Sequence, residues 1–175
     1  TDIDSNSFDN CSISLFLDIT SFDCNDVGAN TVTLTATDVS GNIDSATSVV
    51  IVVDTITPTV LTNNPTVYLD ASGAASITTT DIDSNSFDNC SISLFLDATS
   101  FDCSDVGANT VYLIVTDVNG NVDSASAVVT VVDTIIPSVL TNNTTVYLDA
   151  SGAASITTTD INNSSFDNCG ISSLS

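Results

Sequence analysis

Apolar and polar residues alternate along several short stretches of this chain, and clusters of turn residues separate them. Between residues 56 and 134 the alternating stretches are TVYLD (66–70), AASITTT (74–80), SISLFLD (91–97), SFDC (100–103), TVYLIVTD (110–117) and NVDSASAVVTVVD (121–133). A period of two residues is typical of strands with one buried face. Asn119–Gly120 between the last two stretches indicates a tight hairpin. With about seven short antiparallel strands, the pattern predicts an Ig-like β-sandwich.

The apolar positions of these stretches also predict which side chains form the core. The expected core residues are Val67, Leu69, Ile77, Ile92, Leu94, Leu96, Val111, Leu113, Val115, Val129 and Val131.

The same pattern recurs along the chain with a period of 79 residues, and residues 1–79 match residues 80–158 at 66 positions. We therefore predict tandem domains: the C-terminal part of one repeat (1–55), a complete repeat (56–134) and the N-terminal part of a third (135–175), forming an extended rod. These are called the first, second and third repeats below. Because Thr1 corresponds to Thr80 within a repeat, we expect the chain to belong to a longer array.

The composition restricts the possible partners. The chain has no Lys, Arg or His, and its 22 acidic residues give it a net charge of −22. Nucleic acid is excluded as a partner, because binding to phosphates requires basic residues. No apolar run is long enough to cross a bilayer, so we expect no membrane insertion by these residues. Thr, Val, Ile and Ser dominate, which favours strands.

The cysteines recur with the repeats and indicate an oxidising location. Cys11 and Cys24 are 13 residues apart, as are Cys90 and Cys103. We predict one disulfide within each repeat, Cys11–Cys24 and Cys90–Cys103, with buried free thiols as the alternative. Cys169 is expected to pair with a cysteine beyond residue 175.

Several motifs together resemble a known family. DNCSISLFL, FDCSDVGANTVYLIVTDVNGN and AVVTVVDTIIP are similar to the hyalin-repeat (HYR) type of Ig-like domain. Tandem copies of this type occur in giant secreted surface proteins of Bacteroidota, including gliding adhesins. The resemblance covers essentially the whole chain and implies an extracellular adhesive or structural role without catalytic residues.

The positions of the acidic residues in loops indicate a metal site. In an Ig-like topology, the loop after the second strand and the last hairpin lie at the end of the sandwich that faces the preceding linker. Carboxylate and amide oxygens converging there suit Ca²⁺. The candidate ligands are Asp54, Asp81, Asp83, Asp88, Asp117, Asn119, Asn121, Asp123, Asp133, Asp160 and Asn162. The alternative is that these residues only cap turns.

The sequence therefore favours a non-catalytic function that scales with the number of repeats. Without His, Lys or Arg, most nucleophilic and acid–base arrangements cannot be built. We predict a shaft segment of an extracellular surface filament or adhesin, serving cell adhesion or gliding. Its expected partners are neighbouring repeats of the same chain and, in a filament, other copies. Two alternatives are a self-assembling extracellular fibre and the stalk of a secreted enzyme.

Overall fold

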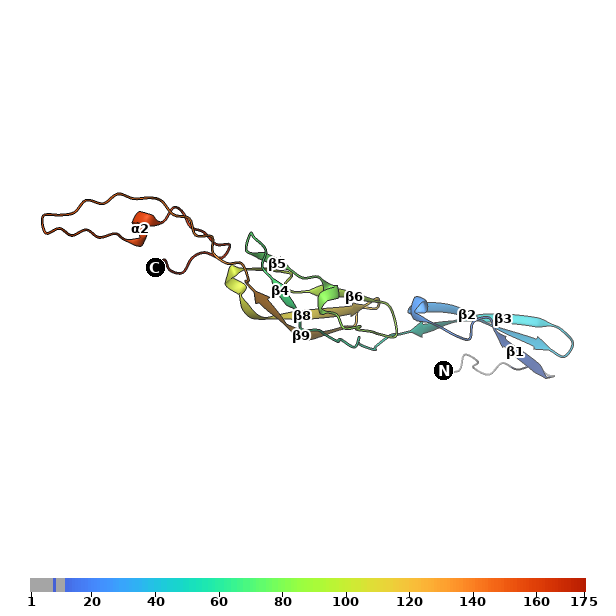
Figure 1. The fold of residues 1–175 in the computed structure, drawn as a ribbon. Coiled ribbons are helices and arrows are strands. Elements are labelled where there is room, and N and C mark those ends of the chain that lie inside the picture. Colours follow the sequence, from blue (N-terminus) through green and yellow to red (C-terminus); the bar gives the residue numbers. More distant parts are fainter. Residues whose placement is uncertain (1–7, 9–11) are drawn as a thin grey trace. The chain divides into compact units, whose positions relative to one another are not determined.

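The computed structural model describes residue 8 and residues 12–175. In the first repeat, strands β1 (Ile13–Leu17), β2 (Gly28–Asp38) and β3 (Ile43–Val52) form one antiparallel sheet in that order (Figure 1). A short 3₁₀ helix, η1 (Cys24–Asp26), precedes β2. The side chain of Asp23 caps η1 by accepting a hydrogen bond from the backbone nitrogen of Asn25 at 2.7 Å.

The second repeat contains two sheets. Its strands are β4 (Thr66–Tyr68), β5 (Ala74–Ser76), β6 (Ile92–Leu96), β7 (Ser100–Asp102), β8 (Gly107–Asp117) and β9 (Val122–Val132). One sheet has the order β4-β9-β8-β6, and the other pairs β5 with β7. The prediction of an all-β sandwich is confirmed. The helical segments of this repeat are α1 (Thr79–Ile82) and η2 (Cys103–Asp105).

The core of the second repeat follows the predicted alternation. Eight of the eleven predicted residues are buried: Leu69, Ile77, Leu96, Val111, Leu113, Val115, Val129 and Val131. Val67, Ile92 and Leu94 are half-buried. Ile82, Phe101 and Ala127 are buried as well and were not predicted.

Two local predictions were wrong. Strands β4 and β9 pair in parallel, with Thr66 opposite Thr130, rather than antiparallel. A short turn makes the two strands that it joins antiparallel. Because β4 and β9 are the first and last strands of the repeat, no turn joins them and turn length does not determine their relative direction. The predicted strand 74–80 ends at Ser76, because Thr78 and Asp81 form a capping box that starts α1.

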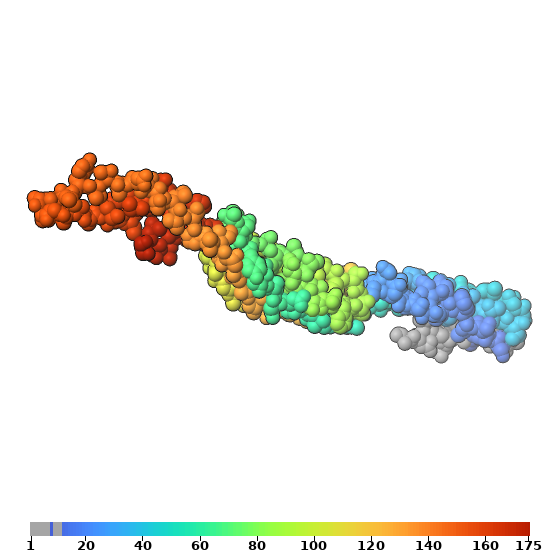
Figure 2. All heavy atoms as spheres, viewed as in Figure 1, coloured from blue at the N-terminus to red at the C-terminus, as the bar shows by residue number. Residues whose placement is uncertain are grey.

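The third repeat shows how far these elements depend on their partners. Its helix α2 (Thr158–Ile161) matches α1, but no strand is assigned between residues 135 and 175. Leu148 is 71% exposed and Ile156 is 54% exposed, whereas the matching Leu69 and Ile77 are 3% and 4% exposed. The segment is drawn in orange to red in Figure 2. In the second repeat β4 and β5 pair with β9 and β7, and among the described residues 135–175 no strand takes the place of β9 or β7.

The chain divides into two compact units. The first comprises Thr1–Pro58, Asp88–Ser93 and Thr116–Val122, and the second comprises Thr59–Phe87, Leu94–Val115 and Asp123–Ser175. The division into domains at residues 55 and 134 stays a prediction.

Candidate functional site

Among the described residues, two disulfides link neighbouring repeats, one between the first and second repeats and one between the second and third. Cys24 pairs with Cys90, and Cys103 pairs with Cys169, each across 66 residues of sequence. The predicted pairs Cys11–Cys24 and Cys90–Cys103 are therefore wrong, and Cys169 pairs with a cysteine of the described chain. Cys11 itself lies outside the described residues.

The elements between Cys90 and Cys103 explain why these two cysteines do not pair. Cys90 precedes β6 and Cys103 follows β7, and these strands belong to different sheets. The chain from Cys90 to Cys103 also passes from the first compact unit into the second. On the chain-entropy model, a closed loop of 66 residues stabilises the fold by about 4 kcal/mol, against about 3 kcal/mol for a loop of 13 residues.

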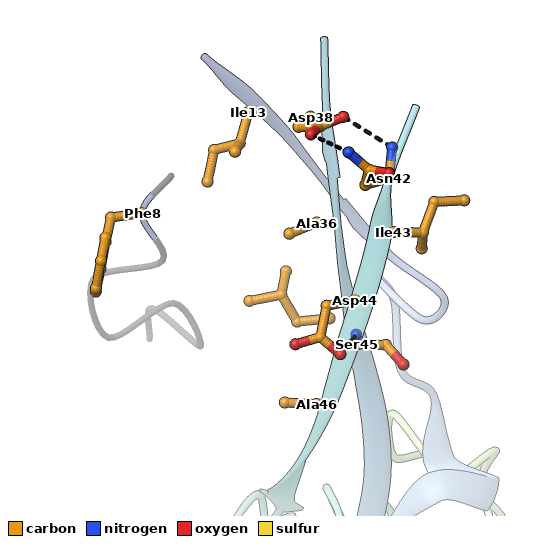
Figure 3. A pocket seen from close by; sticks show the side chains of 10 residues that line it. Phe8, Ile13, Ala36, Asp38, Asn42, Ile43, Asp44, Ser45 and Ala46 are labelled. Carbon is orange, nitrogen blue, oxygen red and sulfur yellow. Dashed lines mark hydrogen bonds between the residues drawn. The ribbon is translucent and has the colours of Figure 1, made fainter. Parts of the chain in front are cut away.

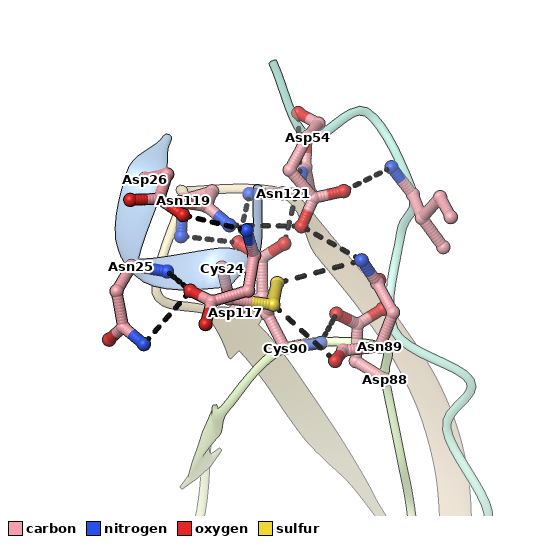
Figure 4. Close-up of a disulfide and its surroundings, with 12 residues drawn as sticks. Cys24, Asn25, Asp26, Asp54, Asp88, Asn89, Cys90, Asp117, Asn119 and Asn121 are labelled. Carbon is pink, nitrogen blue, oxygen red and sulfur yellow. Dashed lines mark hydrogen bonds between the residues drawn. A yellow bond between two sulfur atoms is a disulfide. The ribbon is translucent and has the colours of Figure 1, made fainter. Parts of the chain in front are cut away.

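Acidic and amide side chains surround the first disulfide. We call this group, Cys24, Cys90, Asp54, Asp88 and Asn89, the first clasp (Figure 4). The Oδ2 atom of Asp54 accepts a hydrogen bond from Nδ2 of Asn119 at 2.9 Å. The backbone oxygen of Asp54 accepts one from Nδ2 of Asn121 at 3.4 Å. The hairpin turn between β8 and β9 therefore meets the linker aspartate within the first compact unit.

The amide of Asn89 lies between two carboxylates. In the orientation drawn in Figure 4, its nitrogen donates to Oδ2 of Asp54 at 3.3 Å. With the amide turned over, the nitrogen donates to both oxygens of Asp88, at 2.8 and 3.1 Å. The shorter contacts favour the second orientation. In either orientation the amide donates to one carboxylate and turns its oxygen toward the other. Asp54 also accepts from Asn119, and Asp88 also accepts a hydrogen bond from the backbone nitrogen of Cys90 at 2.9 Å.

The second clasp repeats this arrangement with Cys103, Cys169, Asp133, Asp167 and Asn168. Nδ2 of Asn168 donates to Oδ1 of Asp133 at 3.2 Å, and the backbone nitrogen of Cys169 donates to Oδ1 of Asp167 at 3.0 Å. Oδ2 of Asp167 and Oδ1 of Asn168 are buried without a hydrogen-bond partner among the described residues. The second clasp therefore contains acceptor oxygens that lack a donor among the described residues.

A glycine allows the second clasp to close. Gly73 has a φ of +77°, and a Cβ atom added there would lie 2.7 Å from Sγ of Cys103 and 3.1 Å from the backbone oxygen of Asn168. Both the backbone conformation and the available space therefore require glycine. Gly152, its counterpart in the third repeat, has a φ of +78° but no neighbour within 4 Å.

A buried carboxylate organises the hairpin turn that contacts the first clasp. Asp117 is 5% exposed and accepts hydrogen bonds from the backbone nitrogens of Asn119 and Asn121, at 2.9 and 2.8 Å. Nδ2 of Asn121 donates to its second oxygen at 2.7 Å. Burial raises the pKa of Asp117, but the hydrogen bonds, led by those from Asn121, outweigh burial and hold the pKa below its ordinary value.

Part of the first clasp has a donor set that suits a hard cation. Among the described residues, one group of three potential metal ligands lies within 4.8 Å: Asp54, Asp88 and Cys90. Cys90 cannot contribute a thiolate, because its sulfur is in the disulfide. Asp54, Asp88 and the amide oxygen of Asn89 would supply three of the six to eight oxygens that Ca²⁺ takes, and water would supply the others. These residues therefore fit a partly hydrated calcium site.

Most of the other predicted ligands are used in local structure. Oδ2 of Asp81 accepts hydrogen bonds from the nitrogen and hydroxyl of Thr78, both at 2.7 Å, and Asp83 accepts one from the nitrogen of Ser86 at 2.9 Å. Asp160 and Asn162 make the same contacts in the third repeat. Asp123 is exposed on β9 and accepts a hydrogen bond from the nitrogen of Ser124 at 2.8 Å. None of these five belongs to the group of potential ligands around Asp54.

Asn89, Asn168 and Gly73 were missed as parts of a site. The recurring triplet Asp-Asn-Cys at 88–90 and 167–169 was a signal that could have found the two asparagines. Gly73 carries no such signal, because its neighbours Cys103 and Asn168 are distant in sequence.

A hollow on the first repeat is a less convincing site (Figure 3). It is lined by residues of β1, β2 and β3 together with Phe8, and Leu34 and Ala36 contribute to its floor. Their counterparts Leu113 and Val115 are completely buried in the second repeat. The hollow therefore lies on the face of β2 that corresponds to the core-facing side of β8 in the second repeat.

Comparison with known proteins leaves the family open. No family model matches the sequence, and no curated protein matches it. Among solved structures, a protocadherin gammaB7 EC3-6 cis-dimer is similar, with 19% identity and a TM-score of 0.34 over 82% of this chain. The chain spans 46% of the length of that protocadherin chain. A TM-score this low carries no inference about function.

Among the residues that the structure describes, no helix has the length and apolar character needed to cross a membrane.

Replacing Gly73 should weaken the second clasp. Gly73→Ala and Gly152→Ala both place alanine at a positive φ, which costs about 1–3 kcal/mol. Gly73→Ala must also displace Sγ of Cys103, so we expect the larger loss of unfolding free energy and more free thiol. Denaturant unfolding and thiol titration of the oxidised chains measure both effects. Equal losses in the two variants would contradict the role of Gly73.

Acid should destabilise the chain partly through Asp117. Its pKa lies below the ordinary value of 3.8 in the folded chain, so its contribution is complete above that value. The contribution is lost as the pH falls through the lower, folded pKa. We expect Asp117→Asn to lose less stability between pH 5 and about pH 2 than the parent chain, as measured by urea unfolding. Asp123→Asn, at an exposed position, is the control for the loss of one negative charge.

Proposed function

We propose that this chain is a structural segment of an extracellular surface filament or adhesin shaft, in which covalently joined repeats bear tension and project other regions. The observation that carries this proposal is that each disulfide joins one repeat to the next. A bond within a repeat would stabilise only that repeat, whereas a bond between repeats resists their separation.

Composition and chemistry support the same proposal. Disulfides persist in oxidising compartments, which favours an extracellular location. The absence of Lys, Arg and His disfavours catalysis and binding to nucleic acid. The most specific form of the proposal is a gliding adhesin of Bacteroidota, which the HYR-like motifs support.

Deleting one repeat tests whether the function is structural. In the gene that encodes this chain, an in-frame deletion of residues 56–134 would leave Cys24 and Cys169 separated as Cys24 and Cys90 are now. We expect antibodies to label unpermeabilised cells as before and the adhesion of the cells to persist, because the removed repeat has equivalent neighbours. Loss of adhesion with normal surface labelling would indicate a unique binding or catalytic site in the second repeat. If antibodies labelled cells that carry the undeleted chain only after permeabilisation, the extracellular location would be contradicted.

Exposed aromatic residues favour a second candidate, a self-assembling fibre. Tyr68, Phe95 and Tyr112 are 62%, 62% and 48% exposed, and their strands all belong to the four-stranded sheet of the second repeat. Sedimentation of the purified chain at increasing protein concentration distinguishes the single shaft from the fibre. Monomers throughout support a single shaft, and large species that disappear in Tyr112→Thr support the fibre. Threonine occupies the equivalent position 33 of the first repeat, so this change is compatible with the fold.

We further propose that the clasps bind Ca²⁺ weakly. Support comes from the convergence of Asp54 and Asp88, and from the buried oxygens of Asp167 and Asn168 that lack a donor. No basic side chain is present to offset the charge. Few protein ligands and an open coordination sphere are typical of extracellular sites with dissociation constants of about 10⁻⁴–10⁻³ M.

Calcium should therefore raise the melting temperature more than sodium does at equal ionic strength. At ten times its dissociation constant, Ca²⁺ adds about 1.4 kcal/mol per site. The double variant Asp54→Asn/Asp133→Asn should lose this response. Asp44→Asn/Asp123→Asn removes the same charge from exposed strand positions and should keep it. Equal responses in the two variants would mean that calcium acts only by general screening.

A further inference from the structure

The two disulfides close consecutive loops that do not overlap. The first loop runs from Cys24 to Cys90, and the second from Cys103 to Cys169. Each spans 66 residues of the 79-residue period. Only the 13-residue step from Cys90 to Cys103 lies between them.

We propose that the oxidised chain carries tension along a covalent path that bypasses most of its residues. A force applied at the two ends reaches Cys24, crosses the first disulfide to Cys90, follows the chain to Cys103 and crosses the second disulfide to Cys169. The residues inside the two loops are not on this path. They cannot be drawn out between the ends while the disulfides hold, whether or not they are folded. The repeats therefore form a tether of strictly limited extension.

The elements on the path differ from those that form most of the core. The step from Cys90 to Cys103 contains β6 and β7, which bury Leu96 and Phe101. The long strands β8 and β9, which bury most of the other core residues, lie inside the second loop. Tension is therefore applied directly to β1, which precedes Cys24, to the edge strand β6 of the larger sheet and to β7 of the smaller sheet, and the hairpin of β8 and β9 is shielded.

The difference in extension is large. At about 3.5 Å per residue, a loop of 66 residues would add up to about 230 Å if its disulfide were absent. The 13-residue step can add only about 45 Å. Limited extension follows from the bond pattern alone, so it stands even if the chain bears no load in its natural setting and the proposed function is wrong.

Single-molecule stretching of the 175-residue chain, held by thiol-independent tags at both ends, tests the path. Compared with the oxidised parent, Cys24→Ser/Cys90→Ser should lengthen the fully stretched chain by about 230 Å, as should Cys103→Ser/Cys169→Ser. The quadruple variant should add both increments. Because the measured quantity is the length of the unfolded chain, a variant that fails to fold still reports it. The proposal would be overturned if the oxidised parent stretched as far as the quadruple variant. It would also be overturned if disulfides within repeats limited the gains to about 90 Å for Cys24→Ser/Cys90→Ser and about 45 Å for Cys103→Ser/Cys169→Ser.

A peptide map gives an independent test after free thiols have been blocked. Cleavage before each aspartate releases the identical peptide DNCSISLFL around both Cys11 and Cys90, so the first disulfide is ambiguous by mass. The second is not, because Cys169 lies in the distinct peptide DNCGISSLS (167–175). We expect this peptide to be linked to DCS (102–104). Linkage of DCS to DNCSISLFL instead would refute the bond pattern.

Discussion

The disulfide between neighbouring repeats is the constraint on which the rest of this structure depends. Cys24–Cys90 holds the start of η1 beside the start of β6, and Cys103–Cys169 repeats the arrangement 79 residues later. Each bond also gathers carboxylates in a chain that has no basic side chain. In the first clasp the repulsion between Asp54 and Asp88 is reduced by amide donors from Asn119 and Asn89. Covalent closure and these amides together hold a negatively charged group that would otherwise separate.

The large negative charge has mainly a local, structural use. Asp38, Asp70, Asp102, Asp117 and Asp149 each accept backbone hydrogen bonds from residues that follow closely in sequence. Hydrogen bonds lower the pKa of all five carboxyl groups, those from the side chains of nearby Ser and Asn residues more than those from the backbone. At Asp117 burial raises the pKa, and the hydrogen bonds together outweigh it. A short carboxylate can satisfy a turn in this way, whereas a longer side chain reaches its own backbone less well. Many of the described aspartates therefore serve turn formation, whereas Asp54 and Asp88 of the first clasp lie close enough together to share a cation.

The near-identity of the repeats separates the effects of local sequence from those of neighbours. The capping box and short helix at Thr78–Ile82 recur at Thr157–Ile161, because the hydrogen bonds of that segment are local. By contrast, Leu69 is 3% exposed and Leu148 is 71% exposed, although the residues that flank them in sequence are nearly identical. Burial at this position depends on strands that lie far along the chain.

The sequence by itself determined the all-β class, the hairpin at Asn119–Gly120 and most of the core, because alternation and turn residues act over a few neighbours. It also predicted correctly that Val111, Leu113 and Val115 share a buried face of one strand. The parallel pairing of β4 with β9, the partners of the cysteines and the need for Gly73 were decided only by the tertiary structure. In each of these cases the interacting atoms are separated by about 30 to 95 residues, and a period read along the chain contains no information about which distant segments meet.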